Sequence, residues 1–343
     1  MSKFPVPRPA TVLTLLAALV VVAVLFHVSP GGEYHVSVVE LVGEIFRGPR
    51  EGGTDRLARV NSILWDLRLP RVCVCLLVGA LLGSVGSAFQ ALLRNPLADP
   101  FVLGVSGGAA VGSSLAFLFG FGVLLTTGFG FVGGMLALAL VYALATQRGM
   151  IDVNRLILAG TVTGSLLSSM LTLVLLSAGK DTNVVLRRLM GDMGDAAYWP
   201  TAGLLLVVLL IGFPLLMVQS RNLNALALGG DAARRLGVDP SALARLVLLA
   251  GGFMTAATVA TVGIVGFLGL VAPHLARRLL GVDWRWSLPG SLLMGSLLLV
   301  FADLLAQRAM PSLFGKTGLE LPVGAITSLL GAPTLLVLLR KKS

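Results

Sequence analysis

Few residues of this 343-residue chain combine the type and the spacing that covalent chemistry requires. Gly315-Lys316-Thr317 has the form of the end of a phosphate-binding loop, but Met310 stands where such a loop needs its first glycine. No strand is predicted before these residues, although a phosphate-binding loop follows a strand. We therefore expect this chain to bind no ATP of its own.

A serine nucleophile is the second possibility. Gly104-Val105-Ser106-Gly107 resembles the serine motif of rhomboid proteases, and three histidines could supply a base: His27, His35 and His274. The first two are expected at or beyond the outer end of the first apolar segment. Four residues in a glycine-rich chain are a weak pattern, and no group of His, Cys, Asp or Glu has the spacing of metal ligands. The sequence thus predicts no catalytic residue, no metal site and no bound cofactor.

An ionisable side chain inside an apolar segment would suggest transport driven by an ion gradient. Asp303 is the candidate, and it lies toward the outer end of its segment with Arg308 nearby. A carrier driven by protons or sodium normally has more such groups, so we expect the energy for transport to come from outside this chain. A secondary transporter or channel acting alone is the alternative.

The composition shows which kind of protein positions these residues. Hydrophobic residues make up 56% of the chain and charged residues 12%, about half of the roughly 25% found in soluble domains. A soluble enzyme, a disordered chain and a disulfide-rich scaffold are thereby excluded. The sequence predicts an all-α polytopic membrane protein, with residues 1–343 forming a single transmembrane domain in the lipid bilayer.

Apolar runs bounded by charged residues predict about ten membrane-spanning segments. Strand-like alternation is absent and the runs are too long for barrel strands, so each segment is expected to be a helix. The first is interpreted as a retained helix, because no small-residue cleavage site precedes Ser29. The predicted segments are 11–28, 72–92, 101–119, 127–146, 154–177, 199–218, 242–262, 263–279, 287–306 and 322–339.

The seventh and eighth segments share an uncharged stretch of 31 residues, 246–276. A straight helix of that length would run about 46 Å, which is too long for a hydrocarbon core of about 30 Å, and two full spans would not fit. The residues Gly263, Gly266, Gly269 and Pro273 therefore predict a break and a short second helix.

The net charge of +10 indicates the orientation. Ten spans with an inner N-terminus place 15 of the 26 basic residues and only five of the 16 acidic residues on the inner side, which fits the positive-inside rule. The outer side then holds 11 basic and 11 acidic residues and is neutral. We expect a protein of the cytoplasmic membrane with both termini in the cytoplasm, an outer segment at 29–71 and an inner loop at 219–241. The charge then requires no nucleic-acid partner.

Small residues recur at every fourth position in three segments. Such faces allow helix backbones to approach closely in lipid, so they predict a compact bundle. The three faces are Gly79, Gly83 and Ser87; Gly104, Gly108 and Gly112; and Gly160, Gly164 and Ser168.

Two polar connections on the inner side could move or bind a partner. The turn at Asn95-Pro96-Leu97 is either a rigid connection or part of a gate. The loop 228–240 predicts a short helix, with Asp231 near its start, Arg234 and Arg235 near its end, and glycines on both sides. A helix this short is unstable alone. It is therefore either packed against the bundle or a cytoplasmic partner, or it is a solvated basic loop.

Several motifs, in this order, resemble those of the FecCD-type permeases of ABC importers, and they extend over about residues 60–340. The motifs are Arg68-Leu69-Pro70-Arg71, Gly79-Ala80, Gln90, 95–100, 103–109, 226–229, Ala232 with Arg235-Leu236-Gly237, 263–270, Pro273-His274, Ala302-Asp303, 320–324 and 331–333.

This resemblance implies a ten-helix fold in which a second copy of the permease completes the translocation pathway. It also implies two cytoplasmic ATPase subunits that bind ATP and magnesium, and a periplasmic or lipid-anchored substrate-binding protein. Such permeases import iron–siderophore complexes, haem or cobalamin. A ferric siderophore is expected here as the commonest substrate of the family, with haem and cobalamin as alternatives.

The resemblance also assigns residues on the inner side. The helix that couples to the ATPase matches Gly229, Gly230, Asp231, Ala232, Arg234, Arg235, Leu236 and Gly237. The cytoplasmic gate matches Asn95, Pro96 and Leu97, with a second constriction at the 148–152 turn that includes Arg148, Gly149 and Met150.

On the outer side, family arginines receive carboxylates of the binding protein. Arg68 and Arg71 match two of them, whereas the position of the third holds Gln307, with Arg308 next to it. The outer residues 47–60 have no clear counterpart in the family.

Overall fold

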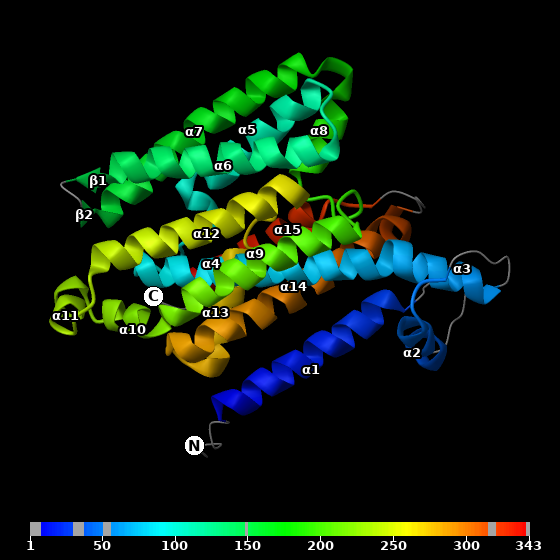
Figure 1. The fold of residues 1–343 in the computed structure, drawn as a ribbon, viewed down its shortest axis with the longest axis horizontal. Helices are drawn as coiled ribbons and strands as arrows, with labels where there is room; N and C mark the ends of the chain where they lie inside the picture. Colours follow the sequence, from blue (N-terminus) through cyan, green and yellow to red (C-terminus); the bar gives the residue numbers. More distant parts are fainter. Residues whose placement is uncertain (1–7, 30–37, 51–55, 148–149, 315–319, 341–343) are drawn as a thin grey trace.

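The computed structural model describes residues 8–29, 38–50, 56–147, 150–314 and 320–340, and most of them are helical (Figure 1). The first part contains α1 (Pro9–Val28), α2 (Val38–Arg47), α3 (Arg56–Ser62), the π-helix η1 (Ile63–Arg68), α4 (Leu69–Leu92), the 3-10 helix η2 (Pro100–Leu103), α5 (Val105–Leu118), α6 (Val123–Ala145) and the strands β1 (Thr146–Gln147) and β2 (Met150–Ile151). The second part contains α7 (Val153–Ser177), η3 (Gly179–Asp181), α8 (Thr182–Leu189), α9 (Trp199–Val218), α10 (Ser220–Ala227), α11 (Gly230–Arg235), α12 (Pro240–Val262), α13 (Leu268–Leu280), α14 (Trp284–Phe314) and α15 (Val323–Arg340).

The ten predicted segments correspond to α1, α4, α5, α6, α7, α9, α12, α13, α14 and α15. Seven of the described helices are long and apolar enough to cross a membrane, and α5 and the described part of α15 are apolar but shorter. The short α13 carries Arg277 and Arg278 in its last turn. The all-α membrane fold is thus confirmed. The largest difference in boundaries is at α4: helix continues backwards from it through η1 and α3 to Arg56, into the predicted outer segment. The π-turn suits Pro70, which has no N–H to donate to an α-helical ladder.

The predicted break near residue 263 is confirmed. α12 ends at Val262, and Gly263 follows with a φ of +82°, a backbone conformation that favours glycine. Phe267 has a φ of +63° and directly precedes α13. Gly269 and Pro273 lie within α13, so only the glycines before Phe267 belong to the break.

Two of the three small-residue faces pack as predicted. A Cβ added to Gly79 of α4 would lie 2.4 Å from the carbonyl oxygen of Gly295 of α14, so the two backbones are in direct contact. Gly108 of α5 has the same relation to Gly133 of α6, at 2.3 Å. The third face is in close contact over a shorter length than predicted. Its Gly160 packs closely, but Gly164 has open space beside it, because the second half of α7 faces outward.

The helices form two groups around α4, whose side chains are mostly buried (Figure 1). On one side α12 lies between α4 and the group of α5, α6 and α7, and on the other α14 lies between α4 and α1. One end of the molecule, at the left of Figure 1, contains the turn 93–99, the β1–β2 hairpin, α10 and α11, and we call it the gate end. The opposite end, with Arg68, Arg71 and Arg308, is the arginine end.

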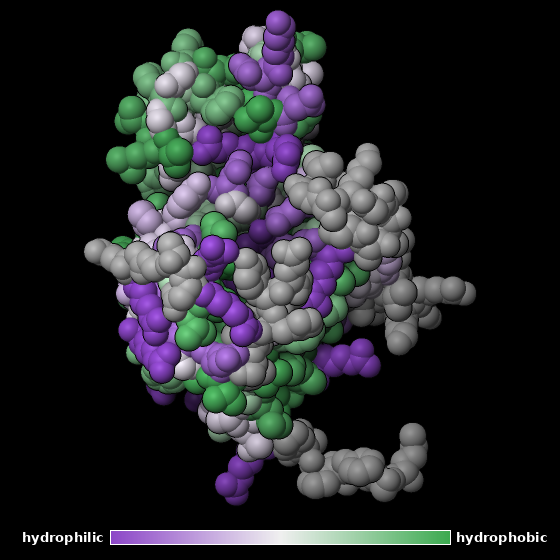
Figure 2. All heavy atoms as spheres, turned by 90° about the vertical axis from the view of Figure 1, so that its right-hand side faces the viewer, coloured by the Kyte–Doolittle hydropathy of each residue, from purple (hydrophilic) through white to green (hydrophobic). Residues whose placement is uncertain are grey.

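The arginine end has a polar face. Hydrophilic side chains gather across its middle and extend to the top right, while hydrophobic side chains lie at the upper left and toward the bottom (Figure 2). This distribution fits a bundle whose sides are covered by lipid and whose end is in water.

The contact between α4 and α14 predicts the effect of adding one methyl group. Gly79→Ala places a Cβ against the backbone of Gly295, which cannot move aside as a side chain does. We expect a loss of about 1–3 kcal/mol of the free energy of unfolding in detergent, measured by thermal and denaturant unfolding. Gly203→Ala in α9 is the control, because nothing lies within 4 Å of its new Cβ. Equal effects of the two substitutions would contradict this account of the packing.

Candidate functional site

The turn between α4 and η2 is held by its own polar groups. Asn95 accepts a hydrogen bond from the N–H of Leu97 through its side-chain oxygen at 2.9 Å, and Asp99 accepts one from Phe101 in the same way. Arg94 has a φ of +49°, which is uncommon for a residue with a Cβ. We call residues 93–99 the gate turn. Its tip is exposed, with Leu97 39% accessible, so it can touch a ligand or a second chain.

The second predicted constriction is a hairpin. Thr146 pairs with Ile151 and Gln147 with Met150, while Arg148 and Gly149 lie outside the described residues. Asp152 then caps α7 by accepting the N–H of Arg155 at 2.9 Å. Met150 is 54% exposed.

The predicted coupling helix is present as α11. Gly229 and Gly237, with φ of +112° and +80°, begin and end it, as the sequence suggested. Ala233 is fully buried and fixes one side of α11, whereas Arg234, Arg235 and Leu236 are exposed on the other. α11 is therefore packed on its own bundle and also has an exposed surface that a partner could contact. We call residues 229–237 the coupling segment.

A cavity of about 410 Å³ at the gate end is bordered by the hairpin, the coupling segment and Arg94 of the gate turn. The predicted gate residues Asn95, Pro96 and Leu97 follow Arg94 directly but do not line this cavity. Its wall is formed by Leu92, Arg94, Gln147, Met150, Ile151, Asp152, Val153, Arg155, Leu156, Leu226, Gly230, Arg234, Pro240, Ser241 and Ala244. The Arg234 guanidinium lies 3.9 Å from the sulfur of Met150, so α11 touches the hairpin directly. Movement of α11 would thus change the wall of a cavity that the gate turn shares.

A second cavity, of about 540 Å³, lies on the other side of Arg94. Its lining residues are Gln90, Arg94, Pro96, Asn224, Ala227, Leu228, Arg277, Val282, Asp283 and Trp284. Arg277 of α13 donates a hydrogen bond to the side chain of Gln90 in α4 and lies over the Trp284 ring, 5.4 Å from its centre. The predicted site residues did not include Asn224, Arg277 or Asp283, because polar residues at helix ends are common.

The arginine end contains a buried ionic cluster around Asp303. Arg71 donates two hydrogen bonds to this carboxylate, at 2.8 and 2.9 Å, and His27 lies 2.7 Å from it. Gln307 donates to it as well, and Arg71 also pairs with Glu320 at 2.7 Å. An aspartate in an apolar segment needs partners, so its pairing was predictable. That the partners would be His27 and Arg71 was not predictable, because these residues lie on two other helices.

The three arginines predicted to receive a binding protein have different environments. Arg71 is turned into the Asp303 cluster, with 13% of its side chain exposed. Arg68 donates to the carbonyl oxygen of Val28, and Arg308 is exposed above the Phe26 ring. Gln307 is bound to Asp303, which leaves Arg308 as the more accessible of the two neighbours. Docking of a partner to these residues stays a prediction.

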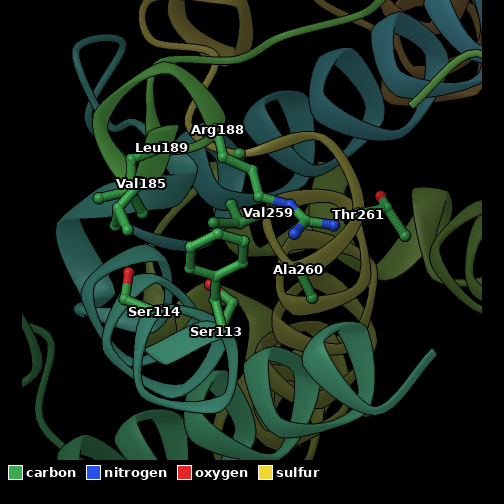
Figure 3. Close-up of a pocket in the computed structure, with 10 residues that line it drawn as sticks. Ser113, Ser114, Val185, Arg188, Leu189, Val259, Ala260 and Thr261 are labelled. Carbon is green, nitrogen blue, oxygen red and sulfur yellow. The ribbon is translucent and has the colours of Figure 1, made fainter. Parts of the chain in front are cut away.

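A small pocket near the arginine end contains none of the predicted site residues. It lies between α5, α8 and the end of α12, and Figure 3 shows Arg188 and Ser114 on opposite sides of it. Its volume of about 20 Å³ holds about one water molecule. The Ser114 hydroxyl is buried and has no partner among the described residues, so a bound water there would satisfy it.

Comparisons with known proteins match nearly the whole chain. The model of the FecCD transport family matches residues 19–341. An ABC transporter permease of Bacillus subtilis, YvrB, is 38% identical over 292 residues, which are 82% of this chain and 80% of the relative. The cobalamin import permease BtuC of Halobacterium salinarum is 34% identical over 347 residues, covering 98% of this chain and 90% of the relative. BtuC of Citrobacter koseri, a vitamin B12 import permease, is 38% identical over 287 residues, which are 83% of this chain and 84% of the relative.

Two solved structures share the fold. A metal-chelate type ABC transporter in an inward-facing conformation superposes with a TM-score of 0.83 at 29% identity, over 97% of this chain and 99% of the other. PsaBC from Streptococcus pneumoniae matches with a TM-score of 0.54 at 16% identity, which shows the fold alone.

The gate turn predicts a dependence of stability on pH. Burial raises the pKa of Asp99 to about 6, and the N–H of Phe101 offsets part of this increase. In the unfolded chain the pKa is near 3.9. The protonated carboxyl therefore stabilises the fold at acidic pH, and this contribution is lost as the pH rises through about 6. Asp99→Asn keeps the accepting oxygen, so its melting temperature should exceed that of the parent by about 2–4 °C at pH 8 and by nothing at pH 4. The same shift at both pH values would contradict the assignment.

The ionic cluster predicts unequal costs for its two acids. Asp303→Asn removes the central charge from a buried set of donors, and we expect a loss of about 3 kcal/mol or more of the free energy of unfolding. Glu320→Gln serves as the matched control, because 41% of its side chain is exposed, and we expect it to cost less than about 1 kcal/mol. Thermal and denaturant unfolding in detergent measure both. A milder effect of Asp303→Asn would show that the cluster adds little to stability.

Proposed function

The chain belongs to the FecCD transport family, and we propose that it forms, with a second copy, the membrane pathway through which an ABC importer carries a metal chelate. Permeases of this family are transport subunits, and ATPase and substrate-binding subunits act with them. One observation supports this proposal most strongly: the gate turn, the hairpin and the coupling segment, far apart in sequence, share the wall of one cavity.

The proposed cycle starts outside this chain. Separate ATPase subunits bind ATP and magnesium, and their closure displaces the exposed side of α11 at Arg234, Arg235 and Leu236. Arg234 passes this displacement to Met150, and the shared cavity passes it to the gate turn. The pathway then opens to one side of the membrane at a time.

A second copy of the chain is proposed to complete the pathway along α7. Hydroxyl side chains occupy one exposed face of this helix, at Thr161, Ser165, Ser169 and Thr172. Each donates a hydrogen bond to a carbonyl oxygen of the preceding turn, so the hydroxyls are satisfied even in lipid. A mildly polar wall of this kind suits passage of a bulky chelate that carries amide and hydroxyl groups.

The gate end is proposed to face the cytoplasm, because the side assigned to it holds 15 of the 26 basic residues but only five of the 16 acidic residues, and because the ATPases act from inside. Both termini would then be cytoplasmic. The arginine end would face the binding protein, with the exposed Arg308 and the half-buried Arg68 as candidate cations. Such charges mainly set orientation and encounter rate.

The proposed substrate is a metal chelate of the size of cobalamin. The relatives named for cobalamin or vitamin B12 import favour a corrinoid over the ferric siderophore that the family's commonest use suggested. A ferric siderophore is the second candidate, and haem is the third.

The test is uptake into liposomes that contain the permease, its ATPase subunits and its binding protein. We expect uptake of radiolabelled cobalamin to require ATP, all three proteins and an intact coupling segment. Uptake of ferric siderophore alone would reassign the substrate. Uptake by the permease without ATPase would instead identify a secondary transporter.

Two substitutions test the coupling segment in the same liposomes. Arg235→Glu reverses an exposed charge of α11, and Gly237→Pro disturbs a residue whose φ is +80°. Each is expected to lower uptake and substrate-stimulated ATP hydrolysis at least tenfold while the protein still inserts. Arg221→Glu in α10, also exposed at this end, is the control and should have little effect. Normal stimulated hydrolysis in the α11 variants would refute the coupling role.

A further inference from the structure

α10 and α14 are joined by a pair of reciprocal hydrogen bonds centred on Asn224. Its amide nitrogen donates to a carboxylate oxygen of Asp283 at 2.8 Å, and its amide oxygen accepts the N–H of Trp284 at 3.0 Å. Among neutral side chains, a primary amide offers a strong donor and a strong acceptor together in one plane. The orientation of the amide is determined, because the N–H of Trp284 can only donate.

The two bonds satisfy groups that would otherwise lack partners. Trp284 is the first residue of α14, and the first four N–H groups of a helix have no partner within it. Hydrogen bonds from the Arg285 side chain, opposed by burial, and from Asn224 lower the pKa of Asp283 to about 2. The acceptor is thus an ionised carboxylate at neutral pH, and hydrogen bonds to charged groups are the stronger kind.

These bonds connect the coupling segment to the helix that carries the gate turn. α11 follows α10 after only two residues, so a displacement of α11 reaches Asn224 directly. α14 in turn contacts α4 backbone to backbone at Gly79 and Gly295, and the pair should move as one body. The gate turn is the direct continuation of α4.

The packing around Asn224 leaves the hydrogen bonds as the directional part of this connection. The cavity of about 540 Å³ is lined by Asn224, Asp283 and Trp284, so one side of this junction borders open space rather than packed side chains. Leu223 and Leu226 of α10 are buried, but apolar contacts are non-directional and allow sliding. Two hydrogen bonds to fixed atoms hold a defined register.

We propose that Asn224 is the positioning residue that ties the coupling segment to the α4–α14 pair, so that movement of α11 reaches the gate turn through Asp283, α14 and α4. This proposal rests on the proposed function. It adds a second route beside the contact between Arg234 and Met150, and it requires the bonds to Asp283 and Trp284 to persist through the transport cycle.

The first test is the number of substrate molecules imported per ATP hydrolysed in the complete liposome system. Asn224→Ala leaves the exposed side of α11 intact, so we expect ATP hydrolysis within about twofold of the parent and import per ATP reduced at least fivefold. The matched control is Asn222→Ala. Asn222 lies on the same helix, and its side-chain amide donates a hydrogen bond to Gln219, three residues before it. Unchanged import per ATP in Asn224→Ala would overturn the proposal.

A cross-link separates positioning from stability. In the double variant Asn224→Cys and Asp283→Cys the hydrogen bonds are lost, and we expect the same loss of import per ATP. A short bifunctional thiol reagent should restore it to within about twofold of the parent, whereas a monofunctional reagent should not. The parent, which has Cys73 and Cys75 only, is treated alongside. Failure of the cross-link to restore import, or arrest of transport by it, would show that α10 and α14 do not move together.

The outcomes distinguish this proposal from the proposed function. If the parent complex shows no import that depends on ATP, the function itself fails, before any variant is compared. If the parent imports and the cross-linked variant does not, only the role of Asn224 fails. Should Asn224→Ala not assemble with its ATPase, the cross-linked variant still decides.

Discussion

The direct contact between the backbones of α4 and α14 supports the rest of the structure. In lipid no hydrophobic force draws helices together, so association depends on close packing and polar contacts, and glycine permits the closest approach. Gly79 and Gly295 leave no room for a Cβ on either side. α4 itself connects the two ends of the molecule, because it carries Arg71 at one end and leads into the gate turn at the other.

The two ends differ in the way they are held. At the arginine end Asp303 is fully buried and bound by side chains of α1 and α4, and breaking such a buried pair is costly. At the gate end two cavities border Arg94, whose backbone lies in the left-handed region. One end therefore resists rearrangement, and the other has space for it. This asymmetry fits the proposed function, in which the gate turn responds to ATPase subunits bound at the same end.

The success and failure of sequence-based prediction follow from how local each feature is. The break at Gly263 and the helix between Gly229 and Gly237 were predicted correctly, because backbone conformation and capping depend on neighbouring residues. The face at Gly160 and Gly164 was predicted too long, because a small-residue pattern does not say where the neighbouring helix ends. The ion pair of Arg71 with Asp303 was not predicted, because the two residues lie on different helices, and docking of a partner to Arg71 stays a prediction.

The sequence by itself determined the spans, their helical nature, the family, and the positions of the polar turn at 93–99 and of the short helix α11. These features depend on the length of apolar runs, on glycines and caps, and on motifs of a few residues. Only the tertiary structure decided which polar side chains meet. Asn224 and Asp283 are 59 positions apart, and Arg71 and Asp303 are 232 apart. Pairs at such separations form only after the helices have packed, so the helix contacts choose the partners and local sequence cannot.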